Sequence, residues 1–182
     1  TVEFRRAMPT VTLIRTYLEQ RSPADLRAAT IDDPNVRVVR VEEPNVALFR
    51  QLYHDVGGPY HWRDRNLLSD EALHAHFRQP HVQLWVMYCG PDPAGFFELQ
   101  RHDDQSVEIV YFGIAPAFFG RGLGKHLLTR AGEQAWAMEG NRVWLHTCTL
   151  DSPSALPNYL ARGFGPFKTE TYETTIPDAA PA

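Results

Sequence analysis

Residues 107–125 read VEIVYFGIAPAFFGRGLGK, and this stretch decides the fold. It begins with β-branched and aromatic residues typical of a strand, Val107–Ile114. A glycine-rich turn, Gly120–Gly124, follows, and the residues after it repeat apolar side chains at helical spacing. Glycines between a strand and a helix let backbone N–H groups approach an anion, and the helix N-terminus adds partial positive charge. The stretch therefore predicts a strand, an anion-binding turn and a long helix over about residues 122–138.

The residue types in this turn suit a pyrophosphate, because Arg121 and Lys125 add full positive charges to the backbone amides. A Walker A loop is excluded, since no Ser or Thr follows Lys125 and the glycine spacing differs. The dinucleotide fingerprint is excluded because the glycines are spaced G-x-G-x-G and no strand with an acidic residue follows at the required place. A glycine-rich helix start that binds nothing remains the alternative.

Two stretches of the sequence resemble motifs of the GNAT superfamily of N-acetyltransferases. The first family motif is [Q/R]-x-x-G-x-[G/A] at the start of the long helix, and residues 119–124 read FGRGLG. Phe119 departs from the Gln or Arg of the motif but leaves the backbone amides available. The second stretch, residues 155–164, reads ALPNYLARGF and is similar to the family's later A-x-x-x-Y-x-x-x-G-F segment. The resemblance implies a mixed α/β fold, with a central, mostly antiparallel twisted sheet whose strands splay, flanked by helices.

The resemblance also implies which residues bind acetyl-CoA, the co-substrate of the family. The main chain of Phe112, Gly113 and Ile114 is expected to pair with the pantetheine arm, where this strand splays from Val143–Thr149. One of these amides is expected to polarise the thioester carbonyl. Ser152 stands where the family often has Asn and is expected to add a hydrogen bond. The turn expected to hold the pyrophosphate comprises Phe119, Gly120, Arg121, Gly122, Leu123, Gly124 and Lys125.

Two side chains are candidates for acid–base chemistry. Glu108 lies in mid-strand among apolar neighbours, where desolvation raises the pKa of a carboxyl toward the range of a general base. By resemblance it takes a proton from the attacking amine, usually through water; the alternative is a solvent-facing Glu with no chemical task. Tyr159 by resemblance protonates the departing thiolate, and a phenol with a pKa of about 10 keeps its proton at neutral pH. The alternative is an aromatic side chain that only packs.

The motifs do not identify the acceptor. In the family it is contacted by the loop between the first two helices and by the end of the chain, here Tyr60–Arg65 and Thr169–Thr175. Their rings and mixed charges fit a small amine, an amino acid, an antibiotic or a peptide N-terminus. His54, His61 and Trp62 either line this acceptor pocket or pack the loop.

Length and composition fit one soluble globular domain: 182 residues, 43% of them hydrophobic and 22% charged. A net charge of -4 gives no basic footprint for nucleic acid. Cys89 and Cys148 are too few for a disulfide framework or a zinc site, and Cys148 is expected to be a buried small hydrophobic residue. No apolar run approaches the roughly 18 residues of a membrane span, and no apolar segment of a secretory signal follows the basic start, Thr1–Met8. We expect a cytoplasmic protein without metal, nucleic acid or membrane partners; family members often form homodimers.

Hydrophobic periodicity predicts the element order ββααβββαβαβ. The first predicted strand, Thr10–Glu19, lies in residues 1–35, which fall outside the family's core pattern and are expected to form an N-terminal extension. Residues 36–182 are expected to form the N-acetyltransferase domain. The other predicted strands are Val36–Val41, Val82–Tyr88, Gly95–Gln100, Val107–Ile114, Arg142–Thr149 and Phe167–Thr175, and the predicted helices cover about 45–56, 70–78, 122–138 and 153–162.

The resulting hypothesis is direct transfer of an acetyl group from acetyl-CoA to a primary amine. The sequence leaves two rivals open. One is a non-catalytic acyl-CoA sensor on the same fold, against which the retained Glu108 and Tyr159 argue. The other is an acyltransferase that uses a longer acyl chain or an oxygen acceptor.

Overall fold

A computed structural model describes residues 9–176 of the chain. The predicted basic start, Thr1–Met8, and residues 177–182 lie outside this range. The order of helices and strands confirms the prediction. The strands are β1 (Thr10–Gln20), β2 (Val36–Arg40), β3 (Val82–Cys89), β4 (Asp92–Arg101), β5 (Ser106–Ile114), β6 (Arg142–Cys148) and β7 (Gly165–Thr175), and the helices are α1 (Val46–Gly57), α2 (Asp70–Phe77), α3 (Leu123–Ala137) and α4 (Ala155–Ala161).

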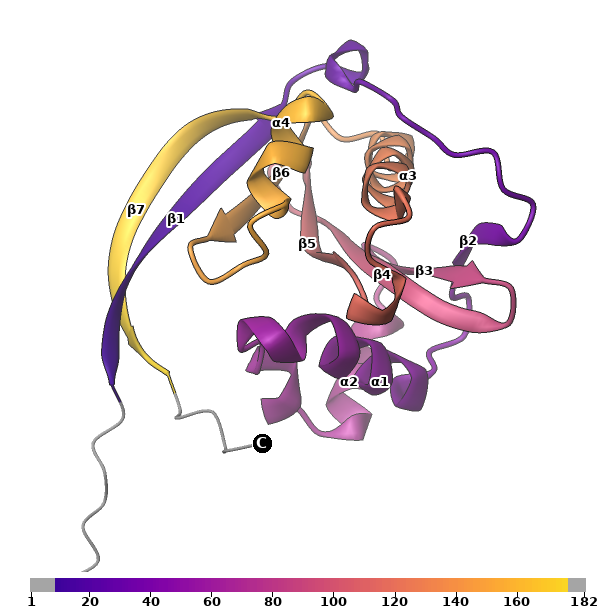
Figure 1. Cartoon of the computed structure of the whole chain (residues 1–182), viewed down its shortest axis with the longest axis horizontal. Helices are drawn as coiled ribbons and strands as arrows, with labels where there is room; N and C mark the ends of the chain where they lie inside the picture. Colours follow the sequence, from indigo (N-terminus) through magenta and orange to yellow (C-terminus); the bar gives the residue numbers. More distant parts are fainter. Residues whose placement is uncertain (1–8, 177–182) are drawn as a thin grey trace, which may run out of the picture.

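All seven strands form one sheet in the order β2-β3-β4-β5-β6-β1-β7, with helices on both of its faces (Figure 1). Every neighbouring pair is antiparallel except β5 and β6, which are parallel. Helix α1 packs Phe49 and Leu52 against Phe96 of β4 in one core cluster. Helix α3 packs Leu127 and Leu128 into a second cluster together with residues of β4, β5 and β6. The mixed α/β sheet flanked by helices agrees with the sequence prediction.

Strands β5 and β6 pair only at their first residues and then separate. Their three paired positions end at Glu108 opposite Trp144, although β5 continues to Ile114. On its other side β5 stays paired with β4 through Ile114, apart from a bulge at Val110. The pairing edge of β5 beyond Glu108 therefore faces a gap, and the prediction of splayed strands is confirmed.

Strand β1 lies in the middle of the part of the sheet formed by β6, β1 and β7, which we call the β1 arm. It is antiparallel to both neighbours, and Leu18 is completely buried in the second core cluster. Figure 1 shows β1 and β7 curving together along one side of the molecule. The boundary predicted at residue 36 thus separates β1 from strands with which it shares a sheet. We propose that residues 10–175 form one domain.

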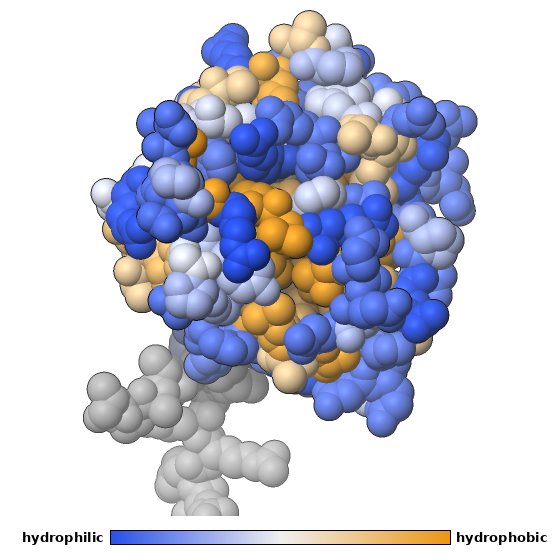
Figure 2. Space-filling model, turned by 90° about the vertical axis from the view of Figure 1, so that its right-hand side faces the viewer, coloured by the Kyte–Doolittle hydropathy of each residue, from blue (hydrophilic) through white to orange (hydrophobic). Residues whose placement is uncertain are grey.

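Hydrophilic side chains cover most of the face in Figure 2, the side on which α3, β2 and β3 lie in Figure 1. Apolar side chains show in a recess at its centre. Exposed large apolar side chains occur on several elements, including Ile14 of β1, Val39 of β2 and Leu160 of α4. Among residues 9–176, no helix is long and apolar enough to cross a lipid bilayer.

Replacement of Gly163 by Ala is expected to destabilise the fold strongly. Gly163 has a φ of +91°, and a Cβ atom there would lie 1.8 Å from the carbonyl oxygen of Asp25. The left-handed conformation costs about 1–2 kcal/mol for Ala, and overpacking adds about 1–3 kcal/mol. For a chain of this size we expect the Tm to fall by roughly 5–15 °C in thermal unfolding.

Gly90→Ala is the matched control, because Gly90 has a φ of +59° but open space around its Cβ position. The free energy of unfolding of this variant is expected to fall only by the cost of the left-handed conformation, about 1–2 kcal/mol. Equal Tm values for the two variants would show that the contact between Gly163 and Asp25 does not hold the segment after β1 against the α4–β7 turn.

Candidate active site

A cavity of about 810 Å³ occupies the gap between β5 and β6. One wall is the free edge of β5, Ile109–Ile114, and a second is the turn before α3. A third wall is the loop after α1, Tyr60–Arg65, and the β1 arm with the start of α4 closes the fourth side. The cavity therefore joins elements far apart in the sequence, and it brings most of the predicted site residues together. Those that line it are Phe112, Gly113, Ile114, Phe119, Gly120, Gly122, Leu123, Gly124, Ser152 and Tyr159.

The turn before α3 has the geometry of an anion site. Gly120 and Gly122 adopt left-handed φ angles of +76° and +71°, and a Cβ atom at Gly120 would meet nothing within 4 Å. No side chain caps the N-terminus of α3, so its first backbone N–H groups are open to a ligand. Arg121 and Lys125 are not among the residues that line the cavity itself. The turn thus fits the pyrophosphate of acetyl-CoA through its main chain, with these two cations beside it.

The main chain of β5 has a free edge that fits the predicted pantetheine arm. Gly113 in this edge is required for packing against α1, which the sequence did not show. A Cβ atom at Gly113 would lie 2.3 Å from Cγ1 of Val56 in α1. The missing side chain therefore permits close packing of α1 on the sheet, rather than approach of a ligand. The strand edge at Phe112–Ile114 still faces the cavity with no paired strand on that side. Its amides and carbonyls are available to an extended ligand.

Tyr159 reaches the cavity from α4. Its ring packs against those of Phe112 and Phe164, with centroids 6.0 and 6.4 Å away. Only 7% of the residue is exposed. Burial raises the pKa of the Tyr159 phenol, and the negative charge of Asp151 raises it further. The hydroxyl therefore keeps its proton at neutral pH, as a proton donor must.

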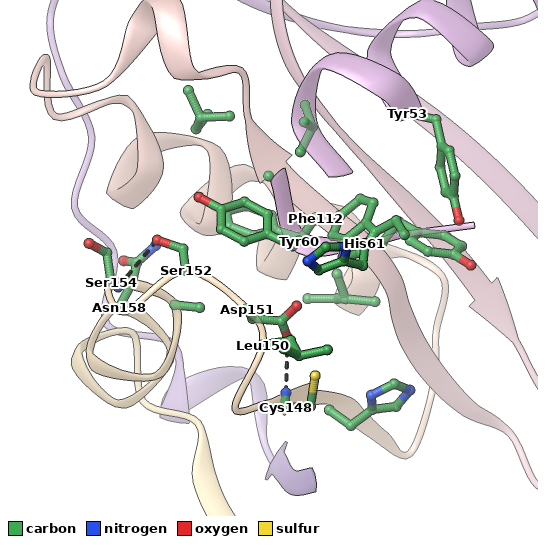
Figure 3. A pocket seen from close by; sticks show the side chains of 18 of the residues that line it. Tyr53, Tyr60, His61, Phe112, Cys148, Leu150, Asp151, Ser152, Ser154 and Asn158 are labelled. Atoms are coloured by element: carbon green, nitrogen blue, oxygen red, sulfur yellow. Dashed lines mark hydrogen bonds between the residues drawn. The ribbon is translucent and has the colours of Figure 1, made fainter. Parts of the chain in front are cut away.

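Ser152, Asn158 and Asp151 hold the segment around the start of α4. Ser152 accepts a hydrogen bond from the backbone of Ser154 (3.3 Å), and Asn158 donates one to the carbonyl of Gly124 in α3 (3.1 Å). Asp151 accepts hydrogen bonds from the Thr147 hydroxyl (2.7 Å) and the Cys148 amide (2.9 Å). Figure 3 shows the Asp151 carboxylate directed into the cavity, close to Cys148. No motif in the sequence marks Asp151 as a site residue.

Glu108 lies where β5 and β6 still pair, and it is not among the residues that line the cavity. Its side chain is 12% exposed, and Oε2 lies 2.8 Å from Nε2 of His102. Burial raises the pKa of the Glu108 carboxyl, while the hydrogen bond with His102 opposes this shift. The raised pKa that the sequence predicted for Glu108 thus agrees with its buried position. The role of Glu108 in proton transfer stays a prediction.

A buried ionic cluster behind the loop wall was missed by the sequence analysis. Glu98 of β4 is completely buried, and its Oε1 lies 2.6 Å from both Nη2 of Arg65 and Nε2 of His76. Arg65 lines the cavity, and its guanidinium carbon lies 5.2 Å from the ring centroid of Tyr111. The one signal in the sequence was a charged residue within an otherwise apolar predicted strand. The ion pair with Glu98 holds the Arg65 guanidinium at the cavity wall.

Cys148 differs from the expectation of a buried residue, since it is partly exposed and lines the cavity. Its neighbour His146 also faces the cavity. Desolvation lowers the pKa of His146, and the charge of Arg15 lowers it further. His146 is therefore neutral near pH 7. Within residues 9–176, no three His, Cys, Asp or Glu side chains lie together as metal ligands would.

Comparison with known proteins identifies the family. Residues 48–164 match the sequence profile of the acetyltransferase (GNAT) family, from α1 to the start of β7. The chain belongs to the GNAT family. A mycothiol acetyltransferase from Corynebacterium efficiens is 31% identical over 111 residues, which are 58% of this chain and 36% of that protein. The chain therefore spans little more than a third of the length of this curated relative.

Solved structures confirm the predicted GNAT-like fold. A GCN5-related N-acetyltransferase from Kribbella flavida superposes with a TM-score of 0.65 at 16% identity, over 93% of this chain and 61% of that one. An aminoglycoside acetyltransferase from an uncultured soil sample superposes with a TM-score of 0.61 at 16% identity, over 71% of this chain and 88% of that one. A Bacillus subtilis acetyltransferase in complex with CoA superposes with a TM-score of 0.53 at 22% identity, over 70% of this chain and 75% of that one. At these identities the superpositions show the GNAT fold and nothing about the acceptor.

Proposed function

We propose that this chain is an N-acetyltransferase that moves the acetyl group of acetyl-CoA to a primary amine by direct attack. One observation carries the proposal: a single cavity connects the open N-terminus of α3, the free edge of β5 and the buried phenol of Tyr159. The first suits a pyrophosphate, the second an extended amide-containing arm and the third a leaving thiolate. The GNAT profile match supports this assignment.

In the proposed complex the coenzyme follows the β5 edge from the turn toward the point where β5 and β6 meet. Backbone amides of Gly120–Lys125 bind the pyrophosphate, and Arg121 and Lys125 contribute charge from outside the cavity. The main chain of Phe112–Ile114 pairs with the pantetheine arm. Ser152 lies on the opposite side of the cavity and offers its hydroxyl. The CoA complex of the Bacillus subtilis relative is in keeping with this use of the fold.

In the proposed reaction the nitrogen of a neutral amine attacks the thioester carbonyl carbon. Glu108 accepts the amine proton through a water molecule, for which its raised pKa suits it. A backbone amide of Gly113 or Ile114 stabilises the oxyanion of the tetrahedral intermediate. The C–S bond then breaks, and Tyr159 donates its proton to the departing sulfur. Positioning in the cavity and these electrostatic contacts supply most of the rate acceleration.

The relatives leave the acceptor open, because they are named for different compounds, the Corynebacterium protein for mycothiol and the soil protein for aminoglycosides. Two walls of the cavity, Tyr60–Arg65 and the end of β7, are proposed to contact the acceptor. A peptide amine is also compatible with the open end of this cavity.

Incubation of the purified protein with acetyl-CoA and a panel of amines is expected to yield N-acetylated products, identified by mass spectrometry, together with free CoA. Acetyl-CoA at about 100 times its Kd is expected to raise the free energy of unfolding by about 2.7 kcal/mol, measured as a thermal shift. The same shift measured with longer acyl-CoAs compares acyl-chain lengths, and alcohol acceptors in the panel test oxygen transfer. A thermal shift without acetylation of any acceptor would support the sensor and contradict the proposal.

A further inference from the structure

The β1 arm presents a row of polar side chains to the cavity. The pairing register places Arg15 of β1 opposite Cys148 of β6 on one side and opposite Glu170 of β7 on the other. Paired residues of antiparallel strands project from the same face of a sheet. Arg15 and Cys148 both line the cavity. The middle of this wall therefore carries a guanidinium beside a thiol.

Arg15 is a cation whose charge is not neutralised by an ion pair. No carboxylate among residues 9–176 forms a salt bridge with it. Its neighbour Glu170 is bound instead by Lys168 and by the Tyr17 hydroxyl. Its guanidinium carbon lies 4.7 Å from the ring centroid of Tyr172. Its Nε atom is buried and has no hydrogen-bond partner in the described chain. A buried N–H group without a partner costs about 1–3 kcal/mol, so a ligand that accepts its hydrogen bond is favoured.

Asp151 supplies a negative charge on the other side of Cys148. Its Oδ2 accepts the two hydrogen bonds from Thr147 and Cys148, and no described residue donates to Oδ1. The carboxylate points into the cavity (Figure 3). Tyr159, the proposed proton donor, lines the same cavity, and the charge of Asp151 raises the pKa of its phenol. His146 lies on the same wall and is neutral near pH 7, so Arg15 and Asp151 are the two charged side chains that the β1 arm and the segment between β6 and α4 present to the cavity.

We propose that the acceptor is an α-amino acid or a close homologue, whose amino group is held by Asp151 and whose carboxylate is bound by Arg15. This inference rests on the proposed function and specifies the acceptor class of the same cavity. Arg15 lies opposite Cys148 in the sheet, and Asp151 accepts a hydrogen bond from the Cys148 amide, so the cation and the anion lie next to the same residue of the cavity wall, as the two charged groups of an amino acid require. Arg15 selects for the carboxylate by charge-assisted hydrogen bonds, and Asp151 places the nitrogen toward the thioester.

The test is a comparison of matched acceptors that differ only at the carboxylate. L-phenylalanine, L-phenylalaninamide and 2-phenylethylamine form one set, and glycine, glycinamide and methylamine form a second. Each KM is expressed as the concentration of the neutral amine, so that differences in amine pKa among the acceptors do not enter the comparison of kcat/KM. We expect the amino acid of each set to exceed its amide and its amine by about 10- to 100-fold, the effect of hydrogen bonds to a charged group.

Arg15→Gln is expected to reduce this preference to within a few-fold of unity, and Arg15→Lys to reduce it partly, because Lys keeps the charge but not the fork of donors. Arg37→Gln is the matched control, since Arg37 also stacks on a tyrosine at 4.7 Å, on Tyr88, but lies on β2 outside the cavity. It is expected to keep the full preference. If Arg15→Gln does not fold, the proposal is tested by the preference of the wild type for the amino acid and by the reduction of this preference in Arg15→Lys.

Equal rates for the members of each set, or a preference that persists in the Arg15 variants, overturn the amino-acid assignment while leaving acetyl transfer in place. Acetylation of no amine in either set or in the wider panel, despite binding of acetyl-CoA, overturns the proposed function and the acceptor assignment with it. Asp151→Asn is expected to raise the KM of every amine in both sets by about 10-fold or more, and an unchanged KM contradicts its place in the subsite.

Discussion

Glu108→Gln is expected to lower kcat for acetyl transfer by about 10²–10⁴ while leaving the affinity for acetyl-CoA unchanged. The amide keeps the size of the side chain and can still accept the hydrogen bond from His102, but it cannot take a proton. The coenzyme walls are formed by other residues, so binding is expected to persist. Steady-state kinetics with a saturating amine and calorimetric titration of acetyl-CoA measure the two quantities.

The pH profile distinguishes a base from a residue that only supports the fold. Burial raises the pKa of Glu108 above the ordinary value of 4.5, so the ionised form, and with it kcat, rises with pH through this higher pKa. His102 opposes the shift through its hydrogen bond, and His102→Gln is therefore expected to move the acid limb to higher pH. The same acceptor is used throughout, so that its own titration cancels. A kcat within a few-fold of the wild type in Glu108→Gln would place the base elsewhere, with Asp151 in the cavity as the next candidate.

The fold was predictable from the sequence because its elements are marked by local patterns. Glycines and prolines separate the segments, and the alternation of apolar residues distinguishes strands from helices. The splay of β5 and β6 followed from the resemblance of residues 107–125 to the GNAT motif. The position of β1 did not follow from any pattern. Pairing of β1 with β6 and β7 is a long-range choice that hydrophobic periodicity does not specify.

In the candidate site too, residues within local motifs were predictable and residues brought together by long-range contacts were not. The turn Gly120–Gly124 and Tyr159 lie in contiguous motifs, and the cavity contains both. Arg15 and Asp151 are distant in sequence and carry no motif, so only the sheet register brings them together. Glu98 gave a weak signal, as a charge in an apolar strand, but its partners Arg65 and His76 come from a separate loop and helix. Interactions that depend on tertiary contacts between such segments need the folded chain to be seen.

Tyr159→Phe is expected to lower kcat by about 10²–10⁴, because it removes the proton donor for the thiolate and keeps the ring. The contacts of the ring with Phe112 and Phe164 remain, so the Tm is expected to change little. Burial and the charge of Asp151 raise the pKa of the Tyr159 phenol, so the hydroxyl holds its proton through the neutral range and well into the alkaline range. The kcat of the wild type is accordingly expected to show no alkaline decline below about pH 10, the pKa of an unperturbed phenol.

Tyr88→Phe is the matched control, since Tyr88 lies on β3 against Arg37 and outside the cavity. It is expected to retain the kcat of the wild type. A Tyr159→Phe variant with unchanged kcat and unchanged affinity for acetyl-CoA would reduce Tyr159 to a packing residue. The thiolate would then leave with a proton from water. A loss of affinity alone, at constant kcat, would instead assign the hydroxyl to binding of the coenzyme in its ground state. A lower kcat at constant affinity is the result that assigns it to the departing sulfur, because only there does the need for a proton arise during the reaction.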